Sequence, residues 1–64
     1  MIKINGINQK INNINLLEYL LSCGYNTKVI AVELNGKIIK KSEFEHITLR
    51  SGDSVEIVSF VGGG

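Results

Sequence analysis

The stretch Ser54-Val55-Glu56-Ile57-Val58-Ser59-Phe60-Val61, followed by Gly62-Gly63-Gly64, decides how this chain folds. Its β-branched and aromatic residues, entered from a turn at Ser51-Gly52-Asp53, predict a strand over residues 54–61. Successive side chains of a strand point to opposite faces, so Val55 and Ile57 share one face and Val58 and Phe60 the other. Such a strand needs neighbours on both sides, and parallel pairing with the first strand of the chain provides one.

Two Asn-Gly pairs predict two β-hairpins upstream of this strand. Asn5-Gly6 separates residues 2–4 from 7–11, and Asn35-Gly36 separates residues 29–34 from 37–40. Asn-Gly readily adopts the two positive φ angles that a type I′ turn requires. In the first hairpin, the apolar residues expected on the buried face are Ile2, Ile4, Ile7 and Ile11, and those expected to face water are Lys3 and Lys10.

One helix is expected between the hairpins. Asn15 and Glu18 have the spacing of a capping box, Ile14 is placed to pack on Tyr19, and Gly24 supplies a left-handed stop. After the second hairpin, residues 42–46 are too short and mixed for a strand, so we expect a single helical turn there. The apolar stripe of the helix consists of Leu16, Leu17, Leu20 and Leu21.

The order of elements is therefore two strands, a helix, two strands, a connector and a last strand. One helix covers only one face of a sheet, so the compact solution is an α+β fold of the β-grasp (ubiquitin-like) type, a mixed sheet of about five strands wrapped on one helix. We expect residues 1–61 to form this domain and residues 62–64 a flexible glycine tail. Val58 and Phe60 then lie on the uncovered face beside the tail, as a docking patch would.

Composition excludes several classes of function. The 64 residues carry a net charge of +1, and acidic and basic residues are intermixed along the chain. A general nucleic-acid binder is expected to have a strongly basic surface instead. No apolar run approaches the roughly 20 residues of a membrane span, so we expect no membrane association. Cys23 is the only cysteine, so no internal disulfide forms and a cytoplasmic location is the simplest inference.

The residues also offer little chemistry of their own. His46 is the only histidine, and neither a nucleophile nor a second metal ligand accompanies it in the sequence. Cys23 lacks a CxxC partner and is expected to act as a small apolar residue. We therefore expect no catalytic residues, no bound metal and no enzymatic activity of the chain by itself. What remains is the α-carboxylate of Gly64, which is ionised at neutral pH and needs activation by a partner, as a mixed anhydride with a nucleotide phosphate, before it reacts.

Several segments together resemble one family. The opening Met1-Ile2-Lys3-Ile4-Asn5-Gly6, the segment from Ala31 to Gly36, the segment from Gly52 to Val58 and the ending Phe60-Val61-Gly62-Gly63-Gly64 are similar to the ThiS family of sulfur carrier proteins of bacterial thiamine biosynthesis. The resemblance covers essentially the whole chain. It implies the β-grasp fold, with Gly63 and Gly64 as the terminal diglycine.

The resemblance also implies a function and partners. The carboxylate of Gly64 would be adenylated with MgATP by an E1-like enzyme (ThiF or a relative) and converted to a thiocarboxylate with sulfur from a cysteine desulfurase or another donor. The carrier would then deliver that sulfur to the thiazole synthase ThiG. Gly62 extends the diglycine, and Phe60 and Val61 match the apolar positions that lead into the tail and would contact these partners. Val58 is added to the partner-binding residues because alternation places it on the uncovered face with Phe60. Cys23 matches no functional position of the family.

Three other functions remain open on the sequence alone. A sulfur carrier for molybdopterin synthesis and a ubiquitin-like modifier of lysines would use the same activation of Gly64. A non-covalent β-grasp interaction module would carry an inert tail. Removal of Gly64 separates the last of these from the others, because only the inert tail leaves function unchanged.

Overall fold

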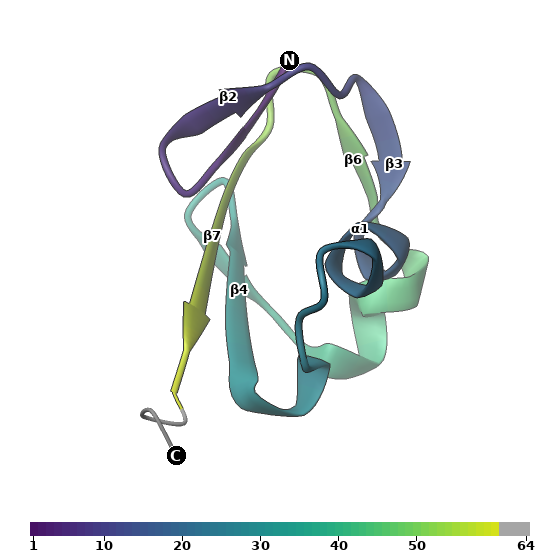
Figure 1. The fold of residues 1–64 in the computed structure, drawn as a ribbon, viewed down its shortest axis with the longest axis vertical. Coiled ribbons are helices and arrows are strands. Elements are labelled where there is room, and N and C mark those ends of the chain that lie inside the picture. Colours follow the sequence, from purple (N-terminus) through teal and green to yellow (C-terminus); the bar gives the residue numbers. More distant parts are fainter. Residues whose placement is uncertain (61–64) are drawn as a thin grey trace.

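The computed structural model describes residues 1–60, in which a five-stranded mixed sheet curves around one helix (Figure 1). The strand order is β2-β1-β7-β4-β5, so the last strand is central, parallel to β1 and antiparallel to β4. This confirms the predicted β-grasp fold and the parallel pairing of the first and last strands. The strands are β1 (Ile2–Ile4), β2 (Ile7–Gln9), β4 (Ile30–Leu34), β5 (Lys37–Ile39) and β7 (Ser54–Ser59).

Both predicted Asn-Gly turns are present, and both are fastened to β7. Asn5 and Asn35 have φ of 49° and 52°, and each glycine that follows also has positive φ. The side-chain oxygen of Asn5 accepts a hydrogen bond from the backbone N–H of Ile57 at 2.6 Å. That of Asn35 accepts from the N–H of Ser54 at 2.9 Å. The hairpin turns therefore bind the central strand as well as reversing the chain.

The helix α1 (Leu16–Ser22) begins and ends as its sequence predicts. The side-chain oxygen of Asn15 accepts from the N–H of Glu18 at 3.0 Å, which satisfies one of the N–H groups left free in the first turn. At the other end, Gly24 has φ of 84° and donates to the carbonyl of Leu21, while Tyr25 donates to the carbonyl of Leu20. This pair of bonds is the Schellman arrangement that glycine permits.

A second, two-stranded sheet was not predicted. β3 (Asn13–Asn15) pairs antiparallel with β6 (Thr48–Arg50), and Ile14 lies opposite the fully buried Leu49. Three-residue strands are too short to show an alternating pattern in the sequence. This small sheet closes the end of the molecule where the chain begins (Figure 1).

The core lies between the five-stranded sheet and α1, and two predicted core positions were wrong. Leu21 is 59% exposed because α1 turns its Leu16, Tyr19 and Leu20 side inward. Ile7 is 64% exposed because it belongs to the edge strand β2, away from α1 (Figure 1). The buried apolar residues are Ile2, Ile4, Leu16, Tyr19, Leu20, Ile30, Val32, Phe44, Leu49, Val55 and Ile57.

The connectors on either side of the second hairpin are short 3₁₀ helices. The first, η1, covers Thr27–Val29, and the second, η2, covers Lys41–His46. The second confirms the helical turn expected over residues 42–46. It also supplies a core residue that the sequence analysis missed, because Phe44 is only 2% exposed and is among the largest buried side chains.

Replacement of Phe44 tests whether this short connector is part of the core. We expect Phe44→Ala to lower the free energy of unfolding by about 3–5 kcal/mol, which is most of the stability of a domain this small. Ile38→Ala is the matched control, since Ile38 is 72% exposed, and it should change stability by less than about 0.5 kcal/mol. Thermal unfolding followed by circular dichroism measures both. Equal stability of the two variants would contradict the placement of Phe44.

Candidate functional site

The candidate site is the C-terminal end of β7, from which the glycine-rich end of the chain departs. The N–H of Phe60 donates to the carbonyl of Val29 at 3.0 Å, so the chain stays beside the start of β4 after β7 ends. The ammonium of Lys41 lies 5.2 Å from the centre of the Phe60 ring and donates to the carbonyl of Lys28. These contacts fix the position of the last described residue, at the end of the molecule opposite the N-terminus (Figure 1).

The face of the sheet away from α1 carries exposed apolar side chains beside this point. Val58 is 59% and Phe60 57% exposed, whereas Val55 and Ile57 are buried against the core, as their alternation predicts. Ala31 lies directly opposite Val58 on β4 and is also exposed. We call Ala31, Ile38, Val58 and Phe60 the open-face patch. The partner-binding role expected of Val58 and Phe60 stays a prediction.

The remaining predicted site residues, Val61, Gly62, Gly63 and Gly64, lie outside the described residues, as does the predicted boundary between domain and tail.

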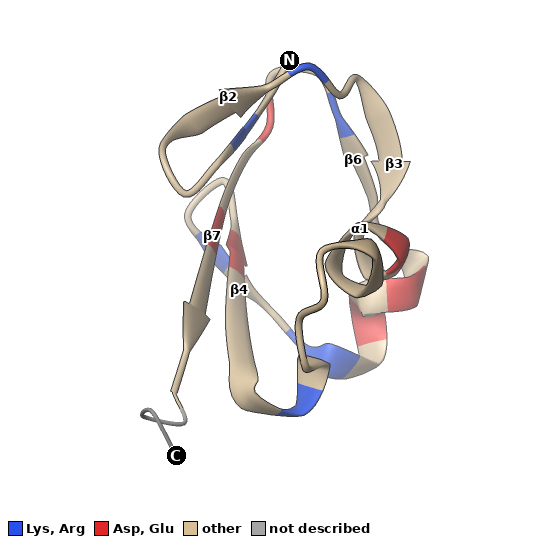
Figure 2. Ribbon diagram, in the orientation of Figure 1, with Lys and Arg blue, Asp and Glu red and all other residues tan. Residues whose placement is uncertain are grey.

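Two carboxylates face each other on the same open surface. Glu33 of β4 and Glu56 of β7 are paired directly across the two strands, and both are exposed. Ile38 of β5 lies opposite Glu33 on its other side, so the acidic pair adjoins the open-face patch. Figure 2 shows the two acidic positions side by side on neighbouring strands. Like charges directly opposed destabilise a sheet. The pair could not be predicted from the sequence because it depends on strand register.

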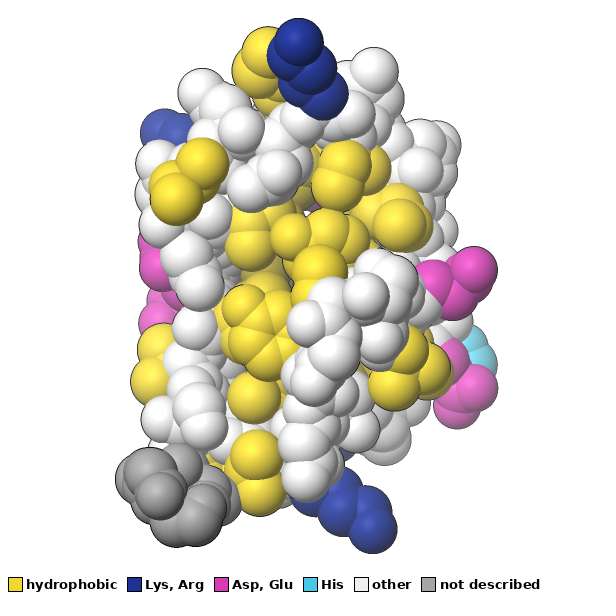
Figure 3. All heavy atoms as spheres, in the orientation of Figure 1, with side chains coloured by type: hydrophobic (Ala, Val, Ile, Leu, Met, Phe, Trp, Pro, Cys, Tyr) yellow, Lys and Arg dark blue, Asp and Glu magenta, His cyan; other side chains and the backbone are white. Residues whose placement is uncertain are grey.

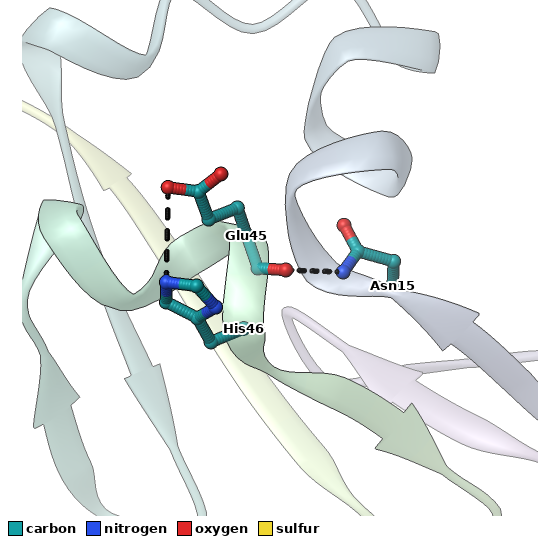
Figure 4. Close-up of polar contacts among 3 residues, drawn as sticks. All are labelled: Asn15, Glu45 and His46. Atoms are coloured by element: carbon teal, nitrogen blue, oxygen red, sulfur yellow. Dashed lines mark hydrogen bonds and ion pairs between the residues drawn. The ribbon is translucent and has the colours of Figure 1, made fainter.

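His46 and Cys23 both lie on the surface of the protein. His46 is exposed, and its ring nitrogen Nε2 lies 3.8 Å from the carboxylate of Glu45, which is also exposed. The carbonyl of Glu45 accepts a hydrogen bond from the side-chain amide of Asn15 at 2.8 Å, which ties η2 to the start of α1 (Figure 4). Cys23 is exposed, so the expectation that it packs as a small apolar residue was wrong.

Among the described residues, Tyr19 is the titratable group whose environment is clearly perturbed. Burial raises the pKa of its phenol to about 12, with smaller contributions from the neighbouring Cys23 and Tyr25 side chains. A phenol held neutral in this way is a core residue, and its hydroxyl lies on the α1 side of the sheet, away from the open face.

Residues 1–60 form no recognisable small-molecule or metal site. No pocket opens within them, and no group of three or more His, Cys, Asp or Glu side chains could hold a metal ion. No helix in that range is long and apolar enough to cross a membrane. Figure 3 shows hydrophobic side chains gathered between the sheet and α1 on one side of the molecule, where partly buried residues pack on the core.

Comparison with protein families gives a match over nearly the whole sequence. Residues 2–64 match the model of the ThiS family, and the match includes the glycine-rich end. The sulfur carrier protein ThiS of Bacillus subtilis is 35% identical over 66 aligned positions that span all of both chains. A thiazole synthase of Paramagnetospirillum magneticum is 37% identical over 62 residues; the match covers 95% of this chain and 19% of that protein.

Solved structures agree with these sequence matches. The crystal structure of the thiamine biosynthesis protein ThiS from Geobacter metallireducens superposes with a TM-score of 0.78 at 30% identity, covering 98% of this chain and 97% of the other. An NMR solution structure of a thiamine biosynthesis protein from the same organism gives a TM-score of 0.79. The fold and the sequence therefore indicate the same family.

The acidic pair on the open face generates a stability prediction. Glu56→Gln removes the charge that opposes Glu33, so we expect the free energy of unfolding at neutral pH and low salt to rise by about 0.2–1 kcal/mol. The gain should shrink at high salt, because salt screens exposed charges. Denaturant unfolding at two ionic strengths measures it. A loss of stability at low salt would contradict the opposition of these two carboxylates.

Proposed function

The chain belongs to the ThiS family, and from that premise we propose that it carries sulfur for thiamine thiazole biosynthesis on the carboxyl group of Gly64. The observation that carries the proposal is the family match through residue 64. It is supported by the exposed apolar side chains on the open face of the sheet, beside the residues that precede the tail. The chain would act as a protein co-substrate of other enzymes.

The chemistry of the carrier follows from the carboxylate. An ionised carboxylate is a poor electrophile, so an E1-like enzyme of the ThiF type would transfer the adenylyl group of MgATP to Gly64 and release pyrophosphate. A sulfide-level donor would then displace AMP and leave a thiocarboxylate directly. A persulfide on a cysteine desulfurase would displace AMP to give an acyl disulfide, whose S–S bond a thiol would reduce to release the thiocarboxylate. ATP and Mg²⁺ belong to the activating enzyme in this scheme. Glycine suits the acceptor position, because the absence of Cβ leaves the carbonyl carbon open to attack.

The thiocarboxylate would finally give its sulfur to a thiazole synthase of the ThiG type. The similarity of this chain to about a fifth of a thiazole synthase supports a functional link between carrier and synthase. Cys23 has no sulfur-carrying role in the proposal, although it is exposed.

The folded part would supply recognition. The open-face patch lies directly before the tail, and the Glu33–Glu56 pair beside it favours a partner that presents a Lys or Arg side chain. Opposite charges across an interface speed association and fix orientation. Partners would therefore hold the sheet by its open face while the tail enters their active sites.

Deletion of Gly64 tests the function in the cell. In a strain that lacks the chromosomal gene, we expect the wild-type gene to restore growth without thiazole and the chain lacking Gly64 to fail. Cys23→Ser is the matched control and should restore growth. A requirement for molybdopterin in the deletion strain, with no requirement for thiazole, would assign the carrier to the other pathway. Full activity without Gly64 would identify an inert tail.

The docking role of the open face is tested separately with the adenylating enzyme. Phe60→Ala should raise the KM for the carrier by about tenfold with little change in kcat, since a buried aromatic anchor contributes more than about 1 kcal/mol to an interface. Ile7→Ala is the matched control, because Ile7 is similarly exposed but lies on the edge strand β2. Equal effects of the two variants in a pyrophosphate-exchange assay would rule out docking through Phe60.

A further inference from the structure

Among residues 1–60, the second half of the central strand β7 has a neighbouring strand on only one side. β1 ends at Ile4, which pairs with Val55, whereas β4 pairs with β7 as far as Ser59. Figure 1 shows the lower half of β7 at the margin of the sheet, with β4 on its other side. A strand that is central near its start thus becomes an edge strand before the tail.

The hydrogen bonds of β7 show which of its backbone groups point to that open edge. The N–H of Ile57 reaches the side chain of Asn5, and the carbonyl of Val55 accepts from the N–H of Asn5, so residues 55 and 57 direct their backbone groups to the β1 side. Phe60 directs its N–H to β4. Because these directions alternate along a strand, the N–H and carbonyl of Ser59 and the carbonyl of Ile57 point to the β1 side.

Those three groups have no hydrogen-bond partner among residues 1–60. β1 has ended at this level, and the Asn5 side chain occupies only the N–H of Ile57. Along the edge, the carbonyl of Ile57 accepts, the N–H of Ser59 donates and the carbonyl of Ser59 accepts. An extended strand can form hydrogen bonds with groups in this order. An unpaired strand edge is a template for pairing with another chain.

We propose that this edge of β7, centred on Ser59, pairs with an extended strand of the adenylating enzyme. The inference rests on the proposed function and adds the mode of recognition. One residue of the enzyme strand would exchange two backbone hydrogen bonds with Ser59. Pairing there would hold β7 in line with the active site that receives Gly64.

The open-face patch indicates the chemistry of that enzyme strand. In the enzyme strand, one residue would pair with Ser59, and the residues before and after it would point to the outer face. Their side chains would lie next to Val58 and Phe60 and are therefore expected to be apolar. The free edge from Ile57 to Ser59 is too short to build a stable interface of about 1,200 Å² by itself. It needs the adjoining open face, so a larger protein surface fits it better than a second copy of this chain pairing edge to edge.

Ser59→Pro tests the pairing, because proline removes the outward N–H and leaves the bonds of β7 to β4 in place. We expect the KM for adenylation to rise about tenfold or more at an unchanged melting temperature. Ser59→Ala keeps the N–H and removes only the hydroxyl, so an equal rise in KM for both variants would assign the effect to the side chain and overturn the inference. A Ser59→Pro chain that melts normally and keeps the wild-type KM would overturn the inference.

Amide hydrogen exchange of the wild-type chain gives a second measurement that needs no substitution. The Ser59 amide should exchange rapidly in the free chain and become protected when the adenylating enzyme is added. Adenylation of Gly64 without protection of Ser59 would overturn the strand pairing and leave the proposed function intact. Protection that rises with the concentration of the free chain would assign the edge to a second copy instead. An enzyme that neither binds nor adenylates the chain would overturn both proposals.

Discussion

The backbone of β7 is the constraint on which the rest of the structure depends. It is hydrogen-bonded to β1 on one side and β4 on the other, and its side chains Val55 and Ile57 reach the core beneath α1. The side chains of Asn5 and Asn35, at the two hairpin turns, add hydrogen bonds to the same strand. The Asn-Gly turns thus hold the strand that leads to the tail as well as reversing the chain.

The two faces of β7 have different roles: one packs in the core, and the other is the surface that we propose partners bind. The residues of β7 that face α1 build the core. Glu56 and Val58 face the other way and stay exposed. The opposed Glu33 and Glu56 are expected to lower stability, and a positively charged partner would relieve that repulsion. In the proposed function the chain serves an activating enzyme and then a sulfur acceptor, and both enzymes would need a surface of this kind by which to hold it.

Local signals in the sequence were sufficient for much of the fold. The Asn-Gly turns, the Asn15 cap and the alternation of β7 each have a cause within a few residues, and the structure confirms them. Features that depend on distant contacts were missed or wrong: the β3–β6 sheet, the burial of Phe44, and the exposure of Ile7 and Leu21. The same holds for the site. Exposure of Val58 and Phe60 could be predicted from alternation, whereas the Glu33–Glu56 pair and the free edge at Ser59 follow from strand register and from where β1 ends.

The central claim is that the carboxyl group of Gly64 carries the sulfur. The most direct test is the intact mass of the chain after incubation with the E1-like enzyme, MgATP and a sulfur donor, followed by fragmentation to locate any change. The account predicts replacement of one oxygen by sulfur, confined to Gly64 and dependent on ATP. An unchanged mass, or sulfur found on Cys23 instead, would contradict it.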